Sequence, residues 1–313
     1  ETDPAAMQGQ ATLKRIAIHS QVADRMHRFE VTLFLPNKTD GPVPVFLFLS
    51  NRGPRSTDPT RQNRTAFWPA EEVIARGYGV AAFRVSEVAP DHPSRYTQGV
   101  IELFEGKDAT RRPDALGAIA AWGWGASRVM DYFETDAQVD ARRIALVGHS
   151  RAGKAALWAG AEDERFAMVV SNGSGSTGAA LSRRRFGETV ARINRNYPHW
   201  FCENYKQFDD REDQLPVDQH MLLSLIAPRL LYVASADQDL WADPRGEFLS
   251  LAHSSDVYAL FGHKPVKPSA MPAVDQSMWV APRGYHIRTG GHDLTAYDWQ
   301  RFMDAADRLW RSK

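Results

Sequence analysis

Residues 143–154 have the sequence RIALVGHSRAGK. The first five letters form an apolar run of strand length, and a helical pattern follows the serine to about residue 161. Gly148 lies two residues before Ser150 and Ala152 lies two residues after it. Small flanks of this kind allow a sharp strand-to-helix turn that presents a serine hydroxyl clear of its own backbone. The stretch therefore predicts a nucleophile elbow at Ser150, although alanine replaces the second glycine of G-x-S-x-G.

Further apolar runs of strand length lie on both sides of this turn. They are Phe29 to Pro36, Pro44 to Ser50, Tyr78 to Val85, Phe166 to Ser171, Arg229 to Ser235 and Gly284 to Thr289. Apolar residues at mixed three and four spacing in Asp114 to Thr135 predict a long amphipathic helix. Buried strands that alternate with helices are typical of a parallel sheet covered on both faces. We therefore expect an α/β fold, a three-layer sandwich with a mostly parallel central sheet, and catalytic groups that follow its strands.

We expect one catalytic domain over residues 11–313. Two long polar stretches that carry aromatic residues lack clean periodicity, and we expect loop insertions there, near residues 86–112 and 182–215. Such loops act as lids or binding loops. Residues 1–10 are polar and lack the layout of a signal peptide, so we expect a start that is disordered, processed or not native.

Composition argues against several kinds of partner. Lys and Arg total 38, as do Asp and Glu, so no net charge favours nucleic acid or an anionic membrane surface. The apolar runs are far shorter than a membrane span. Cys202 is the only cysteine, which excludes an internal disulfide and a multi-cysteine zinc site. No histidine spacing suggests a metal site, and we expect no cofactor.

A histidine near the C-terminus is the expected base, because α/β-hydrolases carry serine, acid and histidine in that chain order. His292 follows the last predicted strand, and Gly290 and Gly291 permit the tight backbone of a catalytic loop. His286 lies inside that strand, where a structural role is the simpler interpretation. The sequence therefore favours His292.

Three aspartates near the strand at Arg229 to Ser235 are candidate acids: Asp237, Asp239 and Asp243. Asp239 is best placed to orient the imidazole, with Asp237 as its nearest rival. Asp243 precedes a proline and is more typical of a turn or a helix start. We expect Asp239 to be the acid, and Asp237 stays open as the alternative.

Two basic residues follow Ser150 on the predicted helix. Arg151 lies in its first turn, where backbone N–H groups and the helix dipole favour an anion. Its amide and its guanidinium are therefore candidates for an oxyanion hole. Lys154 lies one turn further on the same helix face, where it is placed to reach a substrate. The alternative for both side chains is a solvated surface position.

Four motifs occur in order: GHSRAGK at residues 148–154, SGSTGAA at 174–180, WADP at 241–244 and HDL at 292–294. With them the chain resembles the bacterial glucuronoyl esterases of carbohydrate esterase family 15, from about Phe29 to Trp310. The resemblance implies an α/β-hydrolase fold and metal-free hydrolysis of esters that link 4-O-methyl-glucuronic acid on xylan to lignin alcohols. It also implies a secreted or periplasmic location, and we expect a monomer.

The resemblance also assigns roles to single residues. It implies that Ser150 is the nucleophile, Arg151 the oxyanion stabiliser and His292 the base, and that Lys154, Glu188 and Trp241 contact the sugar.

Two departures from the family pattern stand out. Fungal members place the acid on the loop before the S-G-x-G-G-A-A run, where this chain has Gly173, so the role should pass to Asp239 as in bacterial members. Thr177 interrupts the glycine run, and the sequence does not explain its effect.

We therefore expect a serine esterase that hydrolyses (4-O-methyl-)glucuronic acid esters, as in lignin–carbohydrate linkages, through an acyl-enzyme. The first alternative is another carbohydrate esterase, such as an acetyl-xylan esterase, because the same triad would serve it. The second is a catalytically silent sugar-binding protein with the same fold.

Overall fold

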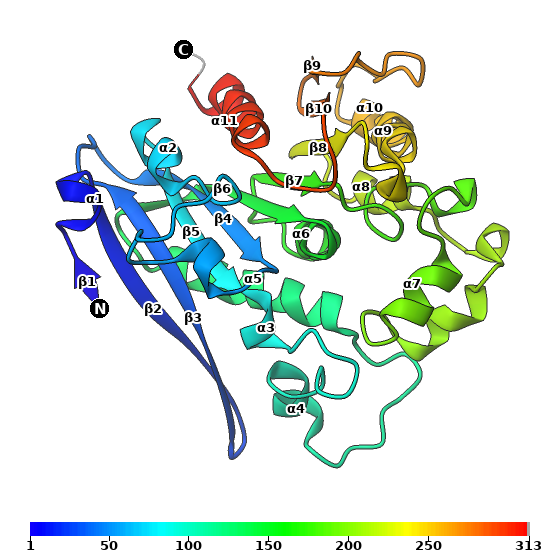
Figure 1. Cartoon of the computed structure of the whole chain (residues 1–313), viewed down its shortest axis with the longest axis horizontal. Coiled ribbons are helices and arrows are strands. Elements are labelled where there is room, and N and C mark those ends of the chain that lie inside the picture. The colour runs from blue at the N-terminus through cyan, green and yellow to red at the C-terminus, as the bar shows by residue number, and fades with distance from the viewer. Residues whose placement is uncertain (312–313) are drawn as a thin grey trace.

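One mixed sheet of ten strands organises the computed structural model, which describes residues 1–311 (Figure 1). The strand order is β1-β2-β3-β5-β4-β6-β7-β8-β10-β9. The strands span Thr2–Asp3 (β1), Ala11–Val22 (β2), Arg25–Pro36 (β3), Val43–Ser50 (β4), Gly79–Arg84 (β5), Val139–His149 (β6), Met168–Asn172 (β7), Leu230–Ala236 (β8), Gln276–Val280 (β9) and Arg283–Arg288 (β10). The central strands from β5 to β10 in this order are parallel, whereas β1, β2, β3 and β9 pair antiparallel at the two edges.

Helices cover both faces of the sheet. They span Ala6–Gly9 (α1), Ala70–Ala75 (α2), Val85–Val88 (α3), Val100–Glu105 (α4), Ala118–Phe133 (α5), Arg151–Glu162 (α6), Val190–Asn196 (α7), Gln219–Ser224 (α8), Pro244–His253 (α9), Ser255–Leu260 (α10) and Ala296–Trp310 (α11). None of these helices within residues 1–311 is long and apolar enough to cross a membrane.

Strand β4 shows why the fold has three layers. Val45 and Leu47 pack into the core formed with α5 and α6, whereas Phe46 and Phe48 pack into the core formed with α2 and α11. Successive side chains of a strand point to opposite faces, so a strand that is apolar throughout needs a helical layer on each side. The predicted α/β fold is confirmed.

The strands predicted from apolar runs are all present, with bounds that differ by a few residues. Strands β2 and β9 were not predicted. Both lie toward the edges of the sheet, and their side chains are largely intermediate or exposed. Edge strands with a solvated face mix polar and apolar residues, and they therefore lack the continuous apolar run of a central strand.

Residues 1–10 include strand β1 and the short helix α1. Strand β1 pairs antiparallel with β2, and the side-chain amide of Asn37 donates hydrogen bonds to the carbonyls of Pro4 and Gly9, both at 2.9 Å. Backbone groups make these contacts, and the side chains of Ala6 and Met7 pack against the core that α2 and α11 cover.

Helix α5 begins at Ala118, later than predicted, because another segment lies against its N-terminal end. The Ala118 amide donates to the carbonyl of His199 at 2.9 Å. A side chain on Gly117 would collide with the backbone of Trp200. The insertion near residues 182–215 therefore packs directly on the start of α5, and this contact positions Trp200.

Candidate active site

Ser150 stands at the turn between β6 and α6. Its φ of 59° and ψ of −127° form a conformation that residues other than glycine rarely adopt. A side chain on Gly148 would collide with the carbonyl of Ala152, and one on Gly153 would approach Cβ of Ser174 to 2.9 Å. The small residues around the serine therefore make the predicted elbow possible.

His292 and Asp239 form a hydrogen-bonded line with Ser150. Nε2 of His292 lies 2.8 Å from Oγ of Ser150, and Nδ1 lies 2.5 Å from Oδ2 of Asp239. Asp239 follows β8 and His292 follows β10, so both come from the carboxyl ends of parallel strands. The Asp239 side chain is buried, whereas the His292 side chain is 42% exposed. In this arrangement an imidazole can accept the serine proton while a carboxylate orients the ring.

The two rival aspartates have other partners. Asp237 Oδ1 accepts a hydrogen bond from the amide of Gly290 at 2.8 Å, so it holds the loop that carries the imidazole. Asp243 caps the N-terminus of α9, as its position before a proline suggested, and it pairs with Arg184 at 2.7 Å. Of the three candidate acids, the structure brings Asp239 to the imidazole.

Gly173 lies directly beside this pair, at the end of β7. A Cβ at this position would lie 3.4 Å from Oδ2 of Asp239 and 3.6 Å from Nδ1 of His292. A carboxylate at residue 173 would therefore enter the space that the Asp239 carboxylate occupies. The acid position of fungal members, residue 173 here, and Asp239 therefore lie in the same region of the site.

Both predicted insertions reach the guanidinium of Arg151. Its Nη1 donates to Oδ2 of Asp91 at 2.6 Å, and its central carbon lies 4.8 Å from the centre of the Trp200 ring. The indole N–H of Trp200 donates to Oδ1 of Asp91 at 2.8 Å, and Nε2 of His199 lies 2.9 Å from the same oxygen. Asp91 belongs to the first insertion, and His199 and Trp200 belong to the second. The two insertions therefore meet at Arg151.

Asp91 is ionised in this setting. Burial raises the pKa of its carboxyl, but hydrogen bonds from His199 and Trp200 and the charge of Arg151 outweigh burial and bring the pKa to about 2. The guanidinium thus keeps an anionic partner beside Ser150. The sequence reasoning missed Asp91. It follows β5, and the rule that functional groups follow strands would have drawn attention to it.

Lys154 is buried and paired with Glu188. Its ammonium group donates to the carbonyls of Ser174 at 2.7 Å and Ser176 at 2.5 Å, and to Oε2 of Glu188 at 3.1 Å. Burial lowers the pKa of Lys154, and the charge of Glu188 partly opposes that effect. All three ammonium donors are engaged within the protein. A contact between Lys154 and a sugar would have to replace one of these bonds.

A cavity of about 210 Å³ opens beside Ser150. Its lining includes all but one of the residues proposed for the site, namely Ser150, Arg151, Lys154, Glu188, Trp241 and His292. Asp239 is the exception, and it contacts the imidazole of His292. The Trp241 side chain is 45% exposed, and the guanidinium carbon of Arg192 lies 5.4 Å from its ring centre. Residues far apart in the sequence thus surround one cavity.

The fold and this geometry define a class of protein. An elbow serine, an acid and a histidine in that chain order, at the carboxyl ends of parallel strands, are the hallmarks of a serine hydrolase with the α/β-hydrolase fold.

Comparison with known proteins gives the family. The sequence profile described as "Glucuronyl esterase, fungi" matches residues 18–262. Carbohydrate esterase MZ0003 from an unknown prokaryotic organism is 39% identical over 96% of this chain and 76% of its own length. The solved structure of a glucuronoyl esterase from Solibacter usitatus has a TM-score of 0.92 and 41% identity, covering 99% of this chain and 85% of that one.

A third relative, the 4-O-methyl-glucuronoyl methylesterase of Cerrena unicolor, is 33% identical over 45% of this chain and 32% of its own length. The chain belongs to the glucuronoyl esterases of carbohydrate esterase family 15, as its motifs suggested, and it is a carboxylic ester hydrolase.

Proposed function

We propose that this protein hydrolyses esters of glucuronic acid and 4-O-methyl-glucuronic acid, with Ser150, His292 and Asp239 as its catalytic triad. The observation that carries the proposal is the 2.8 Å contact between Oγ of Ser150 and Nε2 of His292 in a cavity that Glu188 and Trp241 also line. The name of the Cerrena unicolor relative, 4-O-methyl-glucuronoyl methylesterase, supports the substrate class.

The reaction proceeds in two steps. Ser150 Oγ attacks the ester carbonyl carbon while Nε2 of His292 takes the serine proton. The tetrahedral intermediate places its negative oxygen at the N-terminus of α6, near the Arg151 amide and guanidinium. His292 then returns the proton to the leaving alcohol. Water attacks the acyl-enzyme with the same help, which releases the uronic acid and restores Ser150.

Asp239 determines which nitrogen of His292 acts as the base. Its carboxylate accepts a hydrogen bond from the protonated Nδ1 of His292, so the lone pair of Nε2 points to Ser150. The same carboxylate stabilises the imidazolium that forms when the serine proton is transferred.

Glu188 and Trp241 are suited to the sugar. Lys154 contacts Oε2 of Glu188, which leaves Oε1 to accept hydrogen bonds. We therefore propose that Glu188 accepts hydrogen bonds from the hydroxyl groups of the sugar ring. Trp241 is exposed enough to cover a sugar face with its ring. Lys154 positions the Glu188 carboxylate and balances its charge. Lys154 contacts the sugar directly only if it gives up one of its three hydrogen bonds within the protein.

Ser150→Ala tests the nucleophile. With benzyl glucuronate as substrate we expect kcat to fall by at least about 10³-fold, because the acyl-enzyme no longer forms. Ser277→Ala is the matched control, since Ser277 is exposed on the edge strand β9. Turnover by Ser150→Ala at the rate of the control would overturn the proposal.

An acetylated xylooligosaccharide tests the alternative activity. In a uronate ester the sugar ring is on the acyl side, where Glu188 and Trp241 can bind it. An acetyl group offers these residues nothing to bind. We therefore expect kcat/KM for benzyl glucuronate to exceed that for acetate release, and the opposite order would favour an acetyl esterase.

We also infer that the enzyme is a monomer and that it acts outside the cytoplasm, and its family resemblance supports the location. Ester-bearing xylan is a polymer that does not cross membranes, so the enzyme must meet it outside. Cell fractionation checks the location, and size-exclusion chromatography with light scattering checks the oligomeric state.

A further inference from the structure

His149 is the residue of the GHSRAGK motif that immediately precedes Ser150, and the proposed mechanism gives it no role. It ends strand β6, and its side chain is 2% exposed. The centre of its ring lies 4.6 Å from the centre of the His292 ring, with the two planes tilted by 41°. The ring of Phe67 packs on His149 in a T-shaped contact at 5.5 Å. These separations are typical of aromatic rings in direct contact, so His149 connects the buried core to the catalytic imidazole.

A chain of hydrogen bonds fixes the ring of His149. Its Nδ1 lies 2.6 Å from Oδ1 of Asn172, and Nδ2 of Asn172 donates to Oδ1 of Asp298 at 3.2 Å. The Asp298 carboxylate, which also accepts from Nε of Arg288, can only accept from the Asn172 amide. The amide oxygen therefore faces His149, and Nδ1 of His149 carries the proton. The ring thus has one orientation and one tautomer.

His149 is neutral at the place where His292 becomes charged. Burial lowers the pKa of His149 to about 4, the charge of His292 acts in the same direction, and the hydrogen bond to Asn172 opposes both. A second cation in contact with His292 would raise the energy of the imidazolium that forms when Ser150 gives up its proton. A neutral ring at residue 149 leaves this proton transfer unopposed.

The two hydrogen bonds of His292 do not fix its ring by themselves. Nδ1 contacts Asp239 and Nε2 contacts Ser150, and both nitrogens lie in the plane of the ring. The ring can therefore tilt about the line through the two nitrogens while both distances stay the same. Such a tilt swings the lone pair of Nε2 out of line with Oγ, which impairs proton transfer. A rigid ring packed against His292 prevents the tilt.

We propose that His149 is a positioning residue for the esterase reaction, whose ring packs against that of His292 and keeps Nε2 aligned with Ser150. The inference rests on the proposed function and adds a residue to it. His149 does not line the catalytic cavity, so it acts on the ester only through His292. The proposal requires that the ring at residue 149 matters more for catalysis than its hydrogen bond does.

Two substitutions separate the ring from the hydrogen bond. His149→Asn keeps an N–H donor for Asn172 and removes the ring, whereas His149→Phe keeps a flat ring and removes the donor. Kinetics with methyl glucuronate are measured well below both melting temperatures. We expect kcat of His149→Asn to fall at least about tenfold, with KM within about threefold, because a tilted imidazole impairs proton transfer more than binding. His149→Phe should keep kcat within about threefold of the parent, although its melting temperature falls because Asn172 loses a partner.

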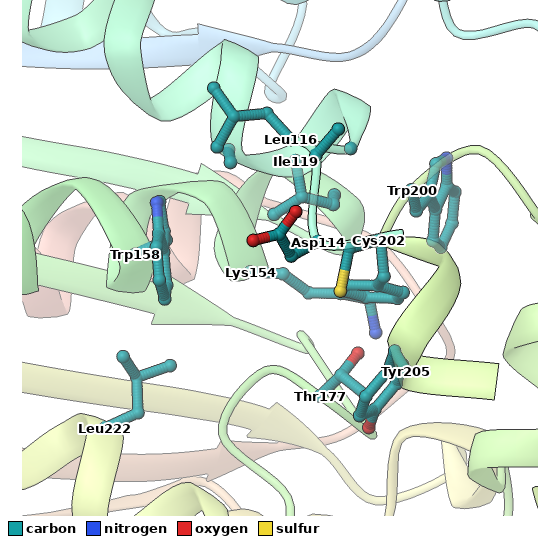
Figure 2. Close-up of a pocket in the computed structure, with 14 residues that line it drawn as sticks. Asp114, Leu116, Ile119, Lys154, Trp158, Thr177, Trp200, Cys202, Tyr205 and Leu222 are labelled. Atoms are coloured by element: carbon teal, nitrogen blue, oxygen red, sulfur yellow. The ribbon is translucent and has the colours of Figure 1, made fainter. Parts of the chain in front are cut away.

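Trp158→Phe is the control, a ring-for-ring change outside the catalytic cavity. Figure 2 shows Trp158 and Trp200 at opposite ends of a neighbouring cavity of about 280 Å³. The kcat of this control should match that of the parent. A kcat of His149→Asn equal to that of the control would overturn the proposal. Equal losses in His149→Asn and His149→Phe would also overturn it, because the ring would then not be what matters. His149→Gln replaces the asparagine variant if that variant does not fold.

The Nδ1 proton of His292 gives a readout that needs no turnover. A proton held between an imidazole and a carboxylate resonates far downfield in the proton NMR spectrum, and rapid exchange with water broadens its signal. Asp239→Asn should remove this signal, which assigns it. In the free enzyme we expect a sharp signal for the parent and His149→Phe, and a broadened one for His149→Asn. Equal widths would contradict the positioning role. The kinetics of Ser150→Ala test the triad separately, so failure of the proposed function and failure of the role of His149 are distinguishable.

Discussion

Asp91 is the single residue on which the position of the Arg151 guanidinium depends most. One of its carboxylate oxygens accepts from Arg151 at 2.6 Å, and the other accepts from Trp200 and contacts His199. A guanidinium that stabilises an oxyanion must be in place before the charge forms, because reorganisation during the reaction raises the barrier. We therefore regard Asp91 as a positioning residue for the proposed reaction.

Asp91→Asn keeps the size of this side chain and removes its charge. We expect kcat to fall by about 10- to 100-fold, with KM within about threefold, because the stabilisation lost belongs to the transition state. Steady-state kinetics with benzyl glucuronate measure both constants. Asp108→Asn, an exposed change in the same insertion, is the control. A parent-like kcat for Asp91→Asn would contradict the positioning role.

Glu247 is a fully buried carboxyl that supports the loop beside the catalytic cavity. Its Oε2 accepts from the hydroxyl of Ser235 at 2.6 Å, and its Oε1 accepts from the amide of Gly175 at 3.0 Å. Burial raises its pKa to about 7, and these hydrogen bonds oppose that rise only in part. The folded protein therefore holds this proton more tightly than the unfolded chain does. The stability it contributes is present below pH 4.5 and is lost as the pH rises through about 7.

Glu247→Gln removes this titration. Relative to the parent, the free energy of unfolding of the variant should rise by on the order of 3 kcal/mol between pH 4.5 and pH 7.5. His149 has the opposite sign, because burial lowers its pKa from 6.5 to about 4, and its contribution is lost as the pH falls. His149 is present in both proteins, so urea denaturation of the pair isolates Glu247. A difference independent of pH would refute this assignment.

At the scale of elements, β10, the His292 loop and α11 form one hydrogen-bonded unit. Arg288 at the end of β10 donates to the carbonyls of Gly291 at 3.1 Å and Asp293 at 2.6 Å, on either side of His292. Asp298, fully buried in the first turn of α11, accepts from Nε of Arg288 at 2.9 Å and completes the capping box of the helix. The helix start therefore fixes the loop that presents the imidazole.

Arg288→Lys separates support of this loop from general stability. Arginine contacts Asp298 through Nε and both carbonyls through Nη2, whereas lysine has a single nitrogen that cannot reach the carboxylate and the carbonyls together. We expect kcat to fall about tenfold with KM within about twofold, because a displaced imidazole impairs proton transfer more than substrate binding. Kinetics and thermal unfolding measure the two effects, and Arg142→Lys is the exposed control. A lower melting temperature with unchanged kcat would assign Arg288 to stability alone.

Local patterns explain which parts of the site could be predicted from the sequence. The elbow at Ser150 and the histidine after the last strand depend on residues that are neighbours in the chain, so spacing reveals them. The partners of Arg151 and Lys154 lie far from them in the chain, so spacing does not reveal these contacts. Asp91 lies 60 positions from Arg151, and the carbonyls that engage Lys154 follow the next strand. Spacing places Lys154 on the helix face of Ser150 but cannot show that its donors are already engaged.

At the scale of the whole molecule, charge is balanced overall, and each of the two cations of the catalytic cavity has an anionic partner. Lysine and arginine total 38, as do aspartate and glutamate. Within the catalytic cavity, Arg151 is paired with Asp91 at 2.6 Å and Lys154 with Glu188 at 3.1 Å. A glucuronate ester carries no charge, because its carboxyl group is esterified. Neither the enzyme nor its substrate therefore has the net charge that steers association over long distances.

The salt dependence of catalysis should reflect this balance. Between about 20 and 500 mM NaCl the Debye length falls below about 10 Å, yet we expect kcat/KM for methyl glucuronate to change less than about twofold, because no net attraction is screened. Glu188→Gln leaves the buried Lys154 cation without its anion. In that variant the glucuronate product, an anion, should inhibit more strongly at low salt, and added NaCl should weaken the inhibition. Initial rates and inhibition constants across the salt series measure both effects. A steep salt dependence for the parent enzyme would show that one of the paired charges acts on the substrate.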